Sequence, residues 1–397
     1  MGTSPDPHRF EQVDWNEVGH SRRFVTPARA VFFAGVVLLV GLYVLQRVDT
    51  VLLGVYFERI DWVILLGTVV LTSGVIVPAV RRRELTRRVL GRLVSRPIHA
   101  AGAVFLGVLS LVAVVGPAVF GSPDLMFQHR FHAPYGFTGE ASWSAECLGE
   151  VTDGEGITRY CDGTMTYPLG TNHRGHPMGH LVVEGARTTL YVLVFTAAFV
   201  VPLAAAVGIV AGFRGGRIDD LLMSYVDVQL CIPAIVVFFI GYMYWNVSLL
   251  LLLVMFGLLS WGGIARLVRS ETLQRREDGH VLVARSLGAS PFYVAKRHIV
   301  PNITNTLVPA IFHLLALLVL VEAGVAFLGF HHLELYSWGS TIQEGLDPSM
   351  TGVGLVVEPH EVWWVSTFPA IALTLTLVSL KLVGDGLRDA LDPRRNH

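Results

Sequence analysis

Eight long apolar runs constrain this chain more than any other feature of its sequence. Each run is close to the roughly 20 residues that an α-helix needs to cross the hydrocarbon core of a bilayer. Of the 397 residues, 52% are hydrophobic and 15% are charged, whereas soluble domains are roughly one quarter charged. These observations predict an all-α polytopic membrane protein with about eight spans, at residues 30–46, 62–80, 100–120, 189–213, 221–244, 249–267, 306–330 and 363–383.

The distribution of arginine between the runs predicts how the spans are oriented. Residues 81–96 hold seven arginines and one glutamate, and loops rich in arginine stay on the cytoplasmic side of a membrane. The loop 121–184 holds eight acidic residues and three arginines, and residues 331–362 hold five acidic residues and no lysine or arginine. Eight spans with both termini in the cytoplasm satisfy this bias at every loop. A nucleic-acid-binding patch at 81–96 is the alternative, and the neighbouring apolar runs disfavour it.

Two of the three cysteines lie in the long acidic loop that the charge pattern assigns to the exterior. Oxidising conditions there would permit a disulfide between Cys147 and Cys161. The third cysteine, Cys231, lies in an apolar run. We therefore expect a disulfide that closes the loop, with two free thiols as the alternative.

Three histidines follow in the same loop, at positions 173, 176 and 180. Imidazole is a common ligand of zinc, nickel and copper, so a metal site has to be considered. The spacing of His173, His176 and His180 is loose, and Pro177 would break any helix that could align them. The pattern favours surface histidines, and we predict no metal site.

A polar and basic stretch, residues 278–302, separates the sixth and seventh runs. Val281, Ala284 and Leu287 recur at helical spacing and are expected to share one face of a short helix. Gly288 then supplies a stop, because glycine readily adopts the left-handed conformation that ends helices. Ser290 and Pro291 form a restart signal, a serine cap followed by proline at the first helical position. The prediction is a helix, a sharp turn and a second helix, with an apolar face that either a soluble partner or the rest of the protein must cover.

Two acidic residues fall within the apolar runs. An ionisable group in hydrocarbon costs several kcal/mol unless it meets water or a partner, so Asp227 and Glu322 are candidate functional residues. Asp227 lies near the predicted cytoplasmic edge, which favours capping or pairing at a helix end. For Glu322 a place in a transport pathway and a hydrogen bond within the bundle both stay open. Pro233, Pro309 and Pro369 are expected to kink their spans.

The stretch 278–302 resembles the cytoplasmic EAA loop of ATP-binding-cassette (ABC) importer permeases, which docks into a cleft on the ATPase subunit. The residues that match the family's motif are Ala284, Arg285, Leu287, Gly288, His298, Pro301 and Asn302. The lead-in departs from the motif, because Leu282 and Val283 stand where the family has glutamate and alanine. The resemblance implies that residues of this loop couple the permease to the ATPase. They are Val281, Ala284, Arg285, Leu287, Gly288, Ser290, Pro291, His298 and Pro301.

Further motifs narrow the resemblance to permeases of the dipeptide, oligopeptide and nickel type, and to the second, C-type permease of the pair that such importers use. The matching stretches are YPLGT at 167–171, EGAR at 184–187, EAGVAFLG at 322–329 and the C-terminal segment that ends DGLRDALDPR at 385–394. Two departures stand out. The spans within 29–80 are extra to the usual six, and residues 172–177, NHRGHP, replace the usual Asp-x-x-Gly-Arg-Asp.

The resemblance divides the chain into five segments. Residues 1–28 would form a cytoplasmic tail, 29–97 an extra two-helix membrane segment, and 98–183 the first core helix with the long external loop. The type I ABC permease domain would cover residues 184–385, within a six-span core, and residues 386–397 would form a cytoplasmic C-terminal tail.

The resemblance implies a permease subunit of an ATP-driven importer for peptides or a similar small solute, with nickel or metal chelates and oligosaccharides as alternatives. Its partners would be a second permease, two ATPase subunits and an extracytoplasmic binding protein. A P-loop needs G-x-x-x-x-G-K-[ST], and the only lysines, Lys296 and Lys381, lie in no such motif. ATP and Mg²⁺ would therefore bind the partner ATPase, and this chain would be no enzyme and hold no cofactor. A secondary transporter and an intramembrane aspartyl protease are the weaker alternatives.

Overall fold

The computed structural model describes residues 26–48, 57–121, 124–141, 145–153, 159–245, 248–330, 335–346 and 358–391. Most of the predicted N-terminal tail and the last six residues of the predicted C-terminal tail lie outside these ranges. The helices are α1 (Pro27–Val48), α2 (Arg59–Leu71), α3 (Val77–Arg81), α4 (Arg83–Ser95), α5 (Pro97–Phe120), α6 (Met178–Phe195), α7 (Val201–Arg214), α8 (Gly216–Cys231), α9 (Ala234–Tyr244), α10 (Leu249–Ser260), α11 (Gly262–Arg275), α12 (Gly279–Ser286), α13 (Pro291–Val294), α14 (Val300–Phe327), α15 (Trp338–Leu346) and α16 (Trp363–Leu391).

Seven stretches of helix in the described residues are long and apolar enough to cross a membrane. They are Pro27–Arg47, Arg59–Arg81, Pro97–Phe120, Met178–Arg214, Leu249–Arg275, Pro291–Phe327 and Trp363–Leu391. Three of them pass through short π-helical turns, η1 (Thr72–Ile76), η3 (Thr196–Val200) and η4 (Ala295–Ile299). The pair α8 and α9 would make an eighth span. The predicted membrane fold is confirmed at this level.

The predicted fifth span, 221–244, is not one straight helix. The axes of α8 and α9 differ by 75°, so this segment is a broken span or a re-entrant loop. The break falls at Ile232 and Pro233, which both have extended backbone dihedrals. Proline has no N–H to donate and disfavours the helical conformation of the residue before it. The kink expected at Pro233 is therefore a full interruption of the helix.

The bundle core combines bulky apolar side chains with close helix contacts. Phe238, Phe256 and Trp261 belong to one large buried cluster shared by several helices. Helices α7 and α11 approach most closely through glycine: a Cβ at Gly208 would lie 2.5 Å from the carbonyl oxygen of Ala265. Small residues permit such contacts between membrane helices, where packing replaces the hydrophobic drive.

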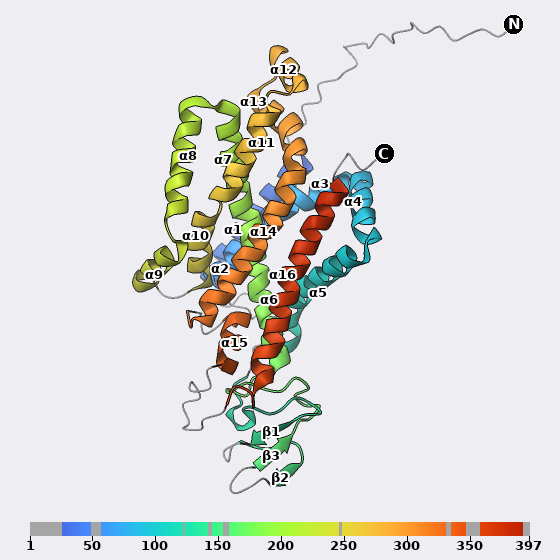
Figure 1. The fold of residues 1–397 in the computed structure, drawn as a ribbon, viewed down its shortest axis with the longest axis vertical. Helices are drawn as coiled ribbons and strands as arrows, with labels where there is room; N and C mark the ends of the chain where they lie inside the picture. The colour runs from blue at the N-terminus through green and yellow to red at the C-terminus, as the bar shows by residue number, and fades with distance from the viewer. Residues whose placement is uncertain are drawn as a thin grey trace, which may run out of the picture.

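The described residues also contain a small antiparallel sheet, which departs from a purely helical chain. Strands β1 (Thr138–Ala141), β2 (Val151–Asp153) and β3 (Arg159–Asp162) lie in the order β1-β3-β2. The acidic loop that holds them also includes the short 3₁₀ turn η2 (Phe127–His129). Figure 1 shows this sheet at one end of the molecule's long axis and α12 and α13 at the other. We call these the sheet end and the loop end.

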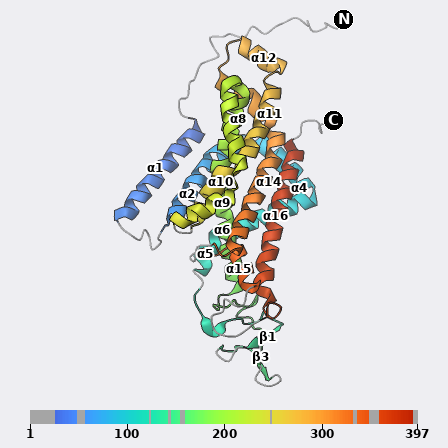
Figure 2. The ribbon, with the colours of Figure 1, turned by 60° about the vertical axis from the view of Figure 1, so that its left-hand side comes forward.

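Helices α1 and α2 differ in how they join the bundle. No described residue of α1 is buried, and Figure 2 shows α1 standing apart from the bundle beside α2. Helix α2 instead packs on α6. The Tyr191 hydroxyl of α6 donates a hydrogen bond to the Asp61 carboxylate of α2 at 2.5 Å, and Arg187 lies 3.6 Å from the same carboxylate. Polar contacts therefore help to hold α2 against the rest of the protein.

Candidate functional site: the 278–302 loop and the polar cluster at the opposite end

The stretch 278–302 forms the predicted helix, turn and helix. Helix α12 ends at Ser286, and Gly288 follows with a φ of +81°. The backbone N–H of Ala289 bonds the carbonyl of Ala284 at 3.0 Å, which closes the end of the helix. The Ser290 hydroxyl accepts a hydrogen bond from the backbone N–H of Tyr293 at 3.3 Å and caps α13. The turn is thus held by backbone and cap bonds rather than by a buried core.

Some apolar side chains of this loop are buried in the protein and others are exposed. Val281 is fully buried and Ala284 is half-buried against the protein's own core. Leu287 lies outside the helix, because α12 ends one residue before it, and it is 83% exposed. Phe292 of α13 is 73% exposed. The helix therefore does not place all three predicted residues on one face. The protein itself covers Val281 and Ala284, whereas Leu287 and Phe292 are left uncovered.

The remaining predicted coupling residues tie this loop to the membrane helices. The Arg285 guanidinium lies 5.6 Å from the centre of the Phe213 ring in α7. His298 lies in η4, the π-helical turn between α13 and α14, and its ring packs 6.0 Å from that of Tyr293. Pro301 occupies the first turn of α14, where its missing N–H is tolerated. From Pro291 onward the helix runs without a gap to Phe327.

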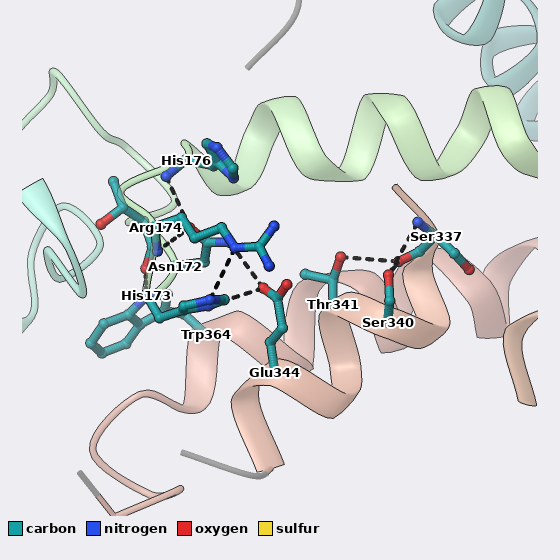
Figure 3. A network of polar contacts seen from close by, with 10 residues as sticks. Asn172, His173, Arg174, His176, Ser337, Ser340, Thr341, Glu344 and Trp364 are labelled. Carbon is teal, nitrogen blue, oxygen red and sulfur yellow. Dashed lines mark hydrogen bonds and ion pairs between the residues drawn. The ribbon is translucent and has the colours of Figure 1, made fainter. Parts of the chain in front are cut away.

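At the sheet end, a buried polar cluster joins the acidic loop to α15 (Figure 3). The Asn172 amide donates a hydrogen bond to the Glu344 carboxylate at 2.9 Å, and Nδ1 of His173 lies 3.5 Å from the same carboxylate. The side-chain Oδ1 of Asn172 accepts hydrogen bonds from the backbone N–H groups of Arg174 and His176 at 3.0 and 2.9 Å. Asn172 therefore both folds its own loop and binds that loop to α15.

Tryptophan side chains and the charge on Glu344 reinforce this junction. The Trp364 indole N–H bonds the carbonyl of Thr171 at 3.0 Å, and the Trp338 indole N–H bonds that of Val182 at 3.0 Å. Burial alone would raise the pKa of Glu344. The hydrogen bonds from His173 and Asn172 and the nearby Arg174 more than offset this effect and hold that pKa below its usual range. The cluster is thus built around an ionised carboxylate.

The three loop histidines are not surface residues, which corrects the sequence prediction. His176 is fully buried against Tyr336, and His173 and His180 are partly buried. Neither ring nitrogen of His176 has a hydrogen-bond partner in the described part of the chain, and burial lowers the pKa of this imidazole to about 4. Among the described residues there is no group of three or more side chains arranged to hold a metal ion. The burial results from α15 covering the loop, which the local sequence does not reveal.

Comparison with known proteins places the chain in a family. Residues 204–397 match the sequence profile of the binding-protein-dependent transport system inner membrane component. The chain is 30% identical to the dipeptide transport system permease protein of Bacillus subtilis over 227 residues, which cover 57% of this chain and 68% of that protein. It is 33% identical over 235 residues to the oligopeptide transport system permease protein of Mycobacterium tuberculosis, covering 57% and 75%.

The chain belongs to this family of ABC importer permeases. It is accordingly a multi-pass membrane protein and a transport component. The profile begins within α7 and includes α12, α13 and the whole of α14 to α16. The loop 278–302 thus lies inside the part of the permease that defines the family, whereas α1 to α5 and the sheet precede it.

Both ionisable residues predicted within the spans of the permease have partners. Asp227 of α8 is exposed and forms an ion pair with Arg266 of α11. Glu322 of α14 is 5% exposed, and its side chain hydrogen-bonds Ser337 just before α15. Of the two predicted alternatives, the structure therefore favours a hydrogen bond of Glu322 within the helix bundle over a place in a transport pathway.

The structure joins Cys147 and Cys161 in a disulfide with a Cα–Cα distance of 5.8 Å. Cys161 lies in β3 and is buried, so the bond ties the segment before β2 to the central strand of the sheet. Cys231 is a free, exposed cysteine in α8.

Sequence reasoning missed the residues that build the polar cluster of the permease. In the sequence, Asn172 stands out only as a departure from the family's pattern, and Glu344 is one of five acidic residues in the segment 331–362. Their contact spans 172 residues of sequence, and no local pattern reports it.

Proposed function

We propose that this chain is the permease subunit of an ATP-driven importer of peptides, and that the loop 278–302 couples it to an ATPase. The relatives named as dipeptide and oligopeptide transport permeases support the substrate class. The observation that carries the coupling role is the exposed pair Leu287 and Phe292 on a capped turn. Large apolar side chains on a rigid protrusion are suited to a cleft on another protein.

The importer contains a second permease, two ATPase subunits and an external solute-binding protein. The loop end faces the cytoplasm and the sheet end faces the exterior, with both chain termini inside. The concentration of arginine at 81–96 supports this orientation. ATP and Mg²⁺ bind the ATPase, because this sequence contains no phosphate-binding P-loop.

The coupling mechanism follows from the continuity of the helix that carries the loop. Residues Pro291–Phe327 form one helical span of 37 residues, about 55 Å long at 1.5 Å per residue. When the ATPase moves the Leu287 and Phe292 side chains, this helix carries the displacement towards the sheet end. The contact of Arg285 with Phe213 passes part of it to α7. The two permeases then alternate between outward and inward openings.

Charged substitutions at the protruding side chains test the proposal. We expect Leu287→Asp combined with Phe292→Asp to reduce ATPase co-purification and the uptake of a labelled dipeptide at least about tenfold, because a carboxylate in an apolar cleft is strongly disfavoured. Met165→Asp is the matched control, since Met165 is 68% exposed but lies near the sheet end. Wild-type behaviour of the double variant would refute the coupling role. A complex that retains the ATPase but takes up neither labelled dipeptides nor labelled hexapeptides would refute the peptide substrate alone.

A further inference from the structure

Helix α4 and the residues just before it carry a basic surface that the transport proposal does not use. Five arginine side chains on this surface are exposed. We call them the basic shelf: Arg81, Arg82, Arg83, Arg87 and Arg88. Among the described residues, only Arg88 of the shelf pairs with an acidic side chain, Glu84 at 3.9 Å, and both side chains of that pair are exposed.

The position of α4 in the chain sets its depth in the membrane. It follows the span Arg59–Arg81 and precedes the span Pro97–Phe120. Both of its ends are therefore at the same membrane surface. A helix of 13 residues is about 20 Å long, and a segment so rich in arginine lies along the surface rather than within the bilayer.

Contacts with the C-terminal end of α16 fix which way α4 faces. Leu93 is 5% exposed and packs so closely on α16 that a Cβ at Gly386 would lie 2.6 Å from it. The Arg92 guanidinium donates to the carbonyl of Ala390 at 2.9 Å, and Arg96 pairs with Asp389 at 2.8 Å. These contacts hold one side of the helix against the protein and leave the basic shelf turned outward.

Exposed apolar side chains flank the buried side of α4. Leu85, Leu90 and Val94 are 50%, 52% and 61% exposed. On a helical wheel they lie on either side of Leu93, and Arg87 and Arg88 lie on the side away from it. Arg83 lies on the same flank as Leu90 and Val94, and Arg81 and Arg82 precede the helix. A helix with arginine on its polar side and leucine at the boundary matches the interface between lipid headgroups and acyl chains.

We propose that the basic shelf binds the headgroups of anionic phospholipids in the leaflet around it. A guanidinium group offers two parallel N–H donors that match phosphate oxygens, and the shelf presents five such groups within eight residues of sequence. Its exposed apolar flanks reach the acyl region of the same lipids. Because α4 is fastened to α16, the bound lipids hold the end of the permease domain at the membrane surface.

The test measures lipid binding to the delipidated full-length chain in detergent. Phosphatidylglycerol or phosphatidylcholine is titrated in mixed micelles, and bound lipid is counted by native mass spectrometry. We expect the variant with all five arginines of the shelf changed to glutamine to bind phosphatidylglycerol at least about tenfold more weakly, with phosphatidylcholine binding unchanged. Raising the salt concentration should weaken phosphatidylglycerol binding to the wild type.

Two controls separate this site from general effects of charge. Changing the same five residues to lysine keeps the charge, so most of the preference for phosphatidylglycerol should persist. Arg285→Gln combined with Arg297→Gln removes charge from the loop 278–302 and should leave lipid binding unchanged. If the five-glutamine variant does not fold, the variant with Arg81, Arg82 and Arg83 changed to glutamine replaces it, with an expected loss of about threefold.

Three results would overturn the proposal. The first is full phosphatidylglycerol binding by the glutamine variant. The second is an equal loss for both lipids, which would show that headgroup charge is not recognised. The third is unchanged lipid binding together with loss of ATPase co-purification, which would make the basic shelf a protein contact instead.

Discussion

The two ends of this permease are built in opposite ways. At the loop end, apolar side chains are exposed: Leu287 is 83% and Phe292 is 73% accessible. At the sheet end, polar side chains are buried: Asn172 and His176 are inaccessible, and Glu344 lies beneath the loop that contains them. An exposed apolar protrusion gains stability when a partner covers it. A buried and hydrogen-bonded polar cluster already holds its own geometry.

This difference supports the proposal that the permease meets its ATPase at the loop end. The sheet end closes on itself through the Glu344 bonds, the tryptophan N–H groups and the disulfide, so the acidic loop and α15 are held together without a partner. The turn at Gly288 has no side-chain neighbour within 4 Å of the place where a Cβ would be. It is held by its backbone bonds and the Ser290 cap, which leaves room beside it for the proposed ATPase contact.

The first prediction, a loss of transport activity, tests the loop end. Gly288→Val should reduce dipeptide uptake at least about tenfold, because a β-branched residue at a φ of +81° is strained by roughly 1–2 kcal/mol and distorts the turn. Uptake is normalised to the amount of permease in the membrane, measured by immunoblotting. Gly288→Asn is the matched control and should retain most uptake, since asparagine tolerates left-handed backbone. Equal activity of the valine and asparagine variants would show that the turn geometry is irrelevant.

The next prediction tests whether the sheet end is self-supporting. Glu344→Ala should lower the free energy of unfolding by about 4 kcal/mol, since it leaves buried Asn172 and His173 without their carboxylate. Thermal unfolding in detergent measures the effect. Glu358→Ala, at an exposed position near the same end, should change stability by less than about 0.5 kcal/mol. If both variants lowered the free energy of unfolding equally, the Glu344 cluster would contribute no more stability than an exposed glutamate does.

Acidification should weaken the sheet end selectively. The buried imidazole of His176 has a pKa of about 4, below the ordinary 6.5, so the unfolded chain takes up a proton first as the pH falls. Stability is then complete above pH 6.5 and decreases by about 3 kcal/mol as the pH approaches 4, at 1.36 kcal/mol per pKa unit. The lowered pKa of Glu344 adds a further loss in the same direction at lower pH.

Thermal unfolding between pH 7.5 and 4 tests this dependence. His176→Phe keeps an aromatic ring against Tyr336 and should flatten the pH profile. His360→Phe, at an exposed position, should leave the wild-type profile unchanged. A profile as steep in His176→Phe as in the wild type would assign the acid sensitivity to other groups.

The smallest expected effect concerns the disulfide. Cys161→Ser should destabilise the sheet end by about 2 kcal/mol, because the bond closes a loop with a sequence separation of only 14 residues. Alkylation of intact protein should modify one cysteine before reduction and three after it, as judged by mass. Cys231→Ser should leave stability unchanged, since that side chain is exposed. Three reactive thiols in the unreduced protein would contradict the bond.

Much of the fold follows from local sequence patterns. The long apolar runs locate the spans, and the Gly288, Ser290 and Pro291 signals correctly predict the turn, because a few adjacent residues determine each of these structures. Pro233 predicts a kink in its span. The angle between the two halves of the span depends on the packing of neighbouring helices.

The polar cluster could not be predicted in the same way. The burial of His176 depends on α15, which follows it by about 160 residues, and the sequence around the histidine looks like an exposed loop. The prediction that Leu287 lies on the same helix face as Val281 and Ala284 is wrong, because α12 ends at Ser286, one residue before Leu287. Long-range pairs and exact helix ends both depend on tertiary contacts.

The bond between Asp61 and α6 has a consequence for how the protein is made. Synthesis proceeds from the N-terminus, so α2 leaves the ribosome before Arg187 and Tyr191 exist. Until then the Asp61 carboxylate lacks these two partners, and water at the membrane surface must solvate it. The polar contacts that join α2 to the bundle can therefore form only after α6 has been made.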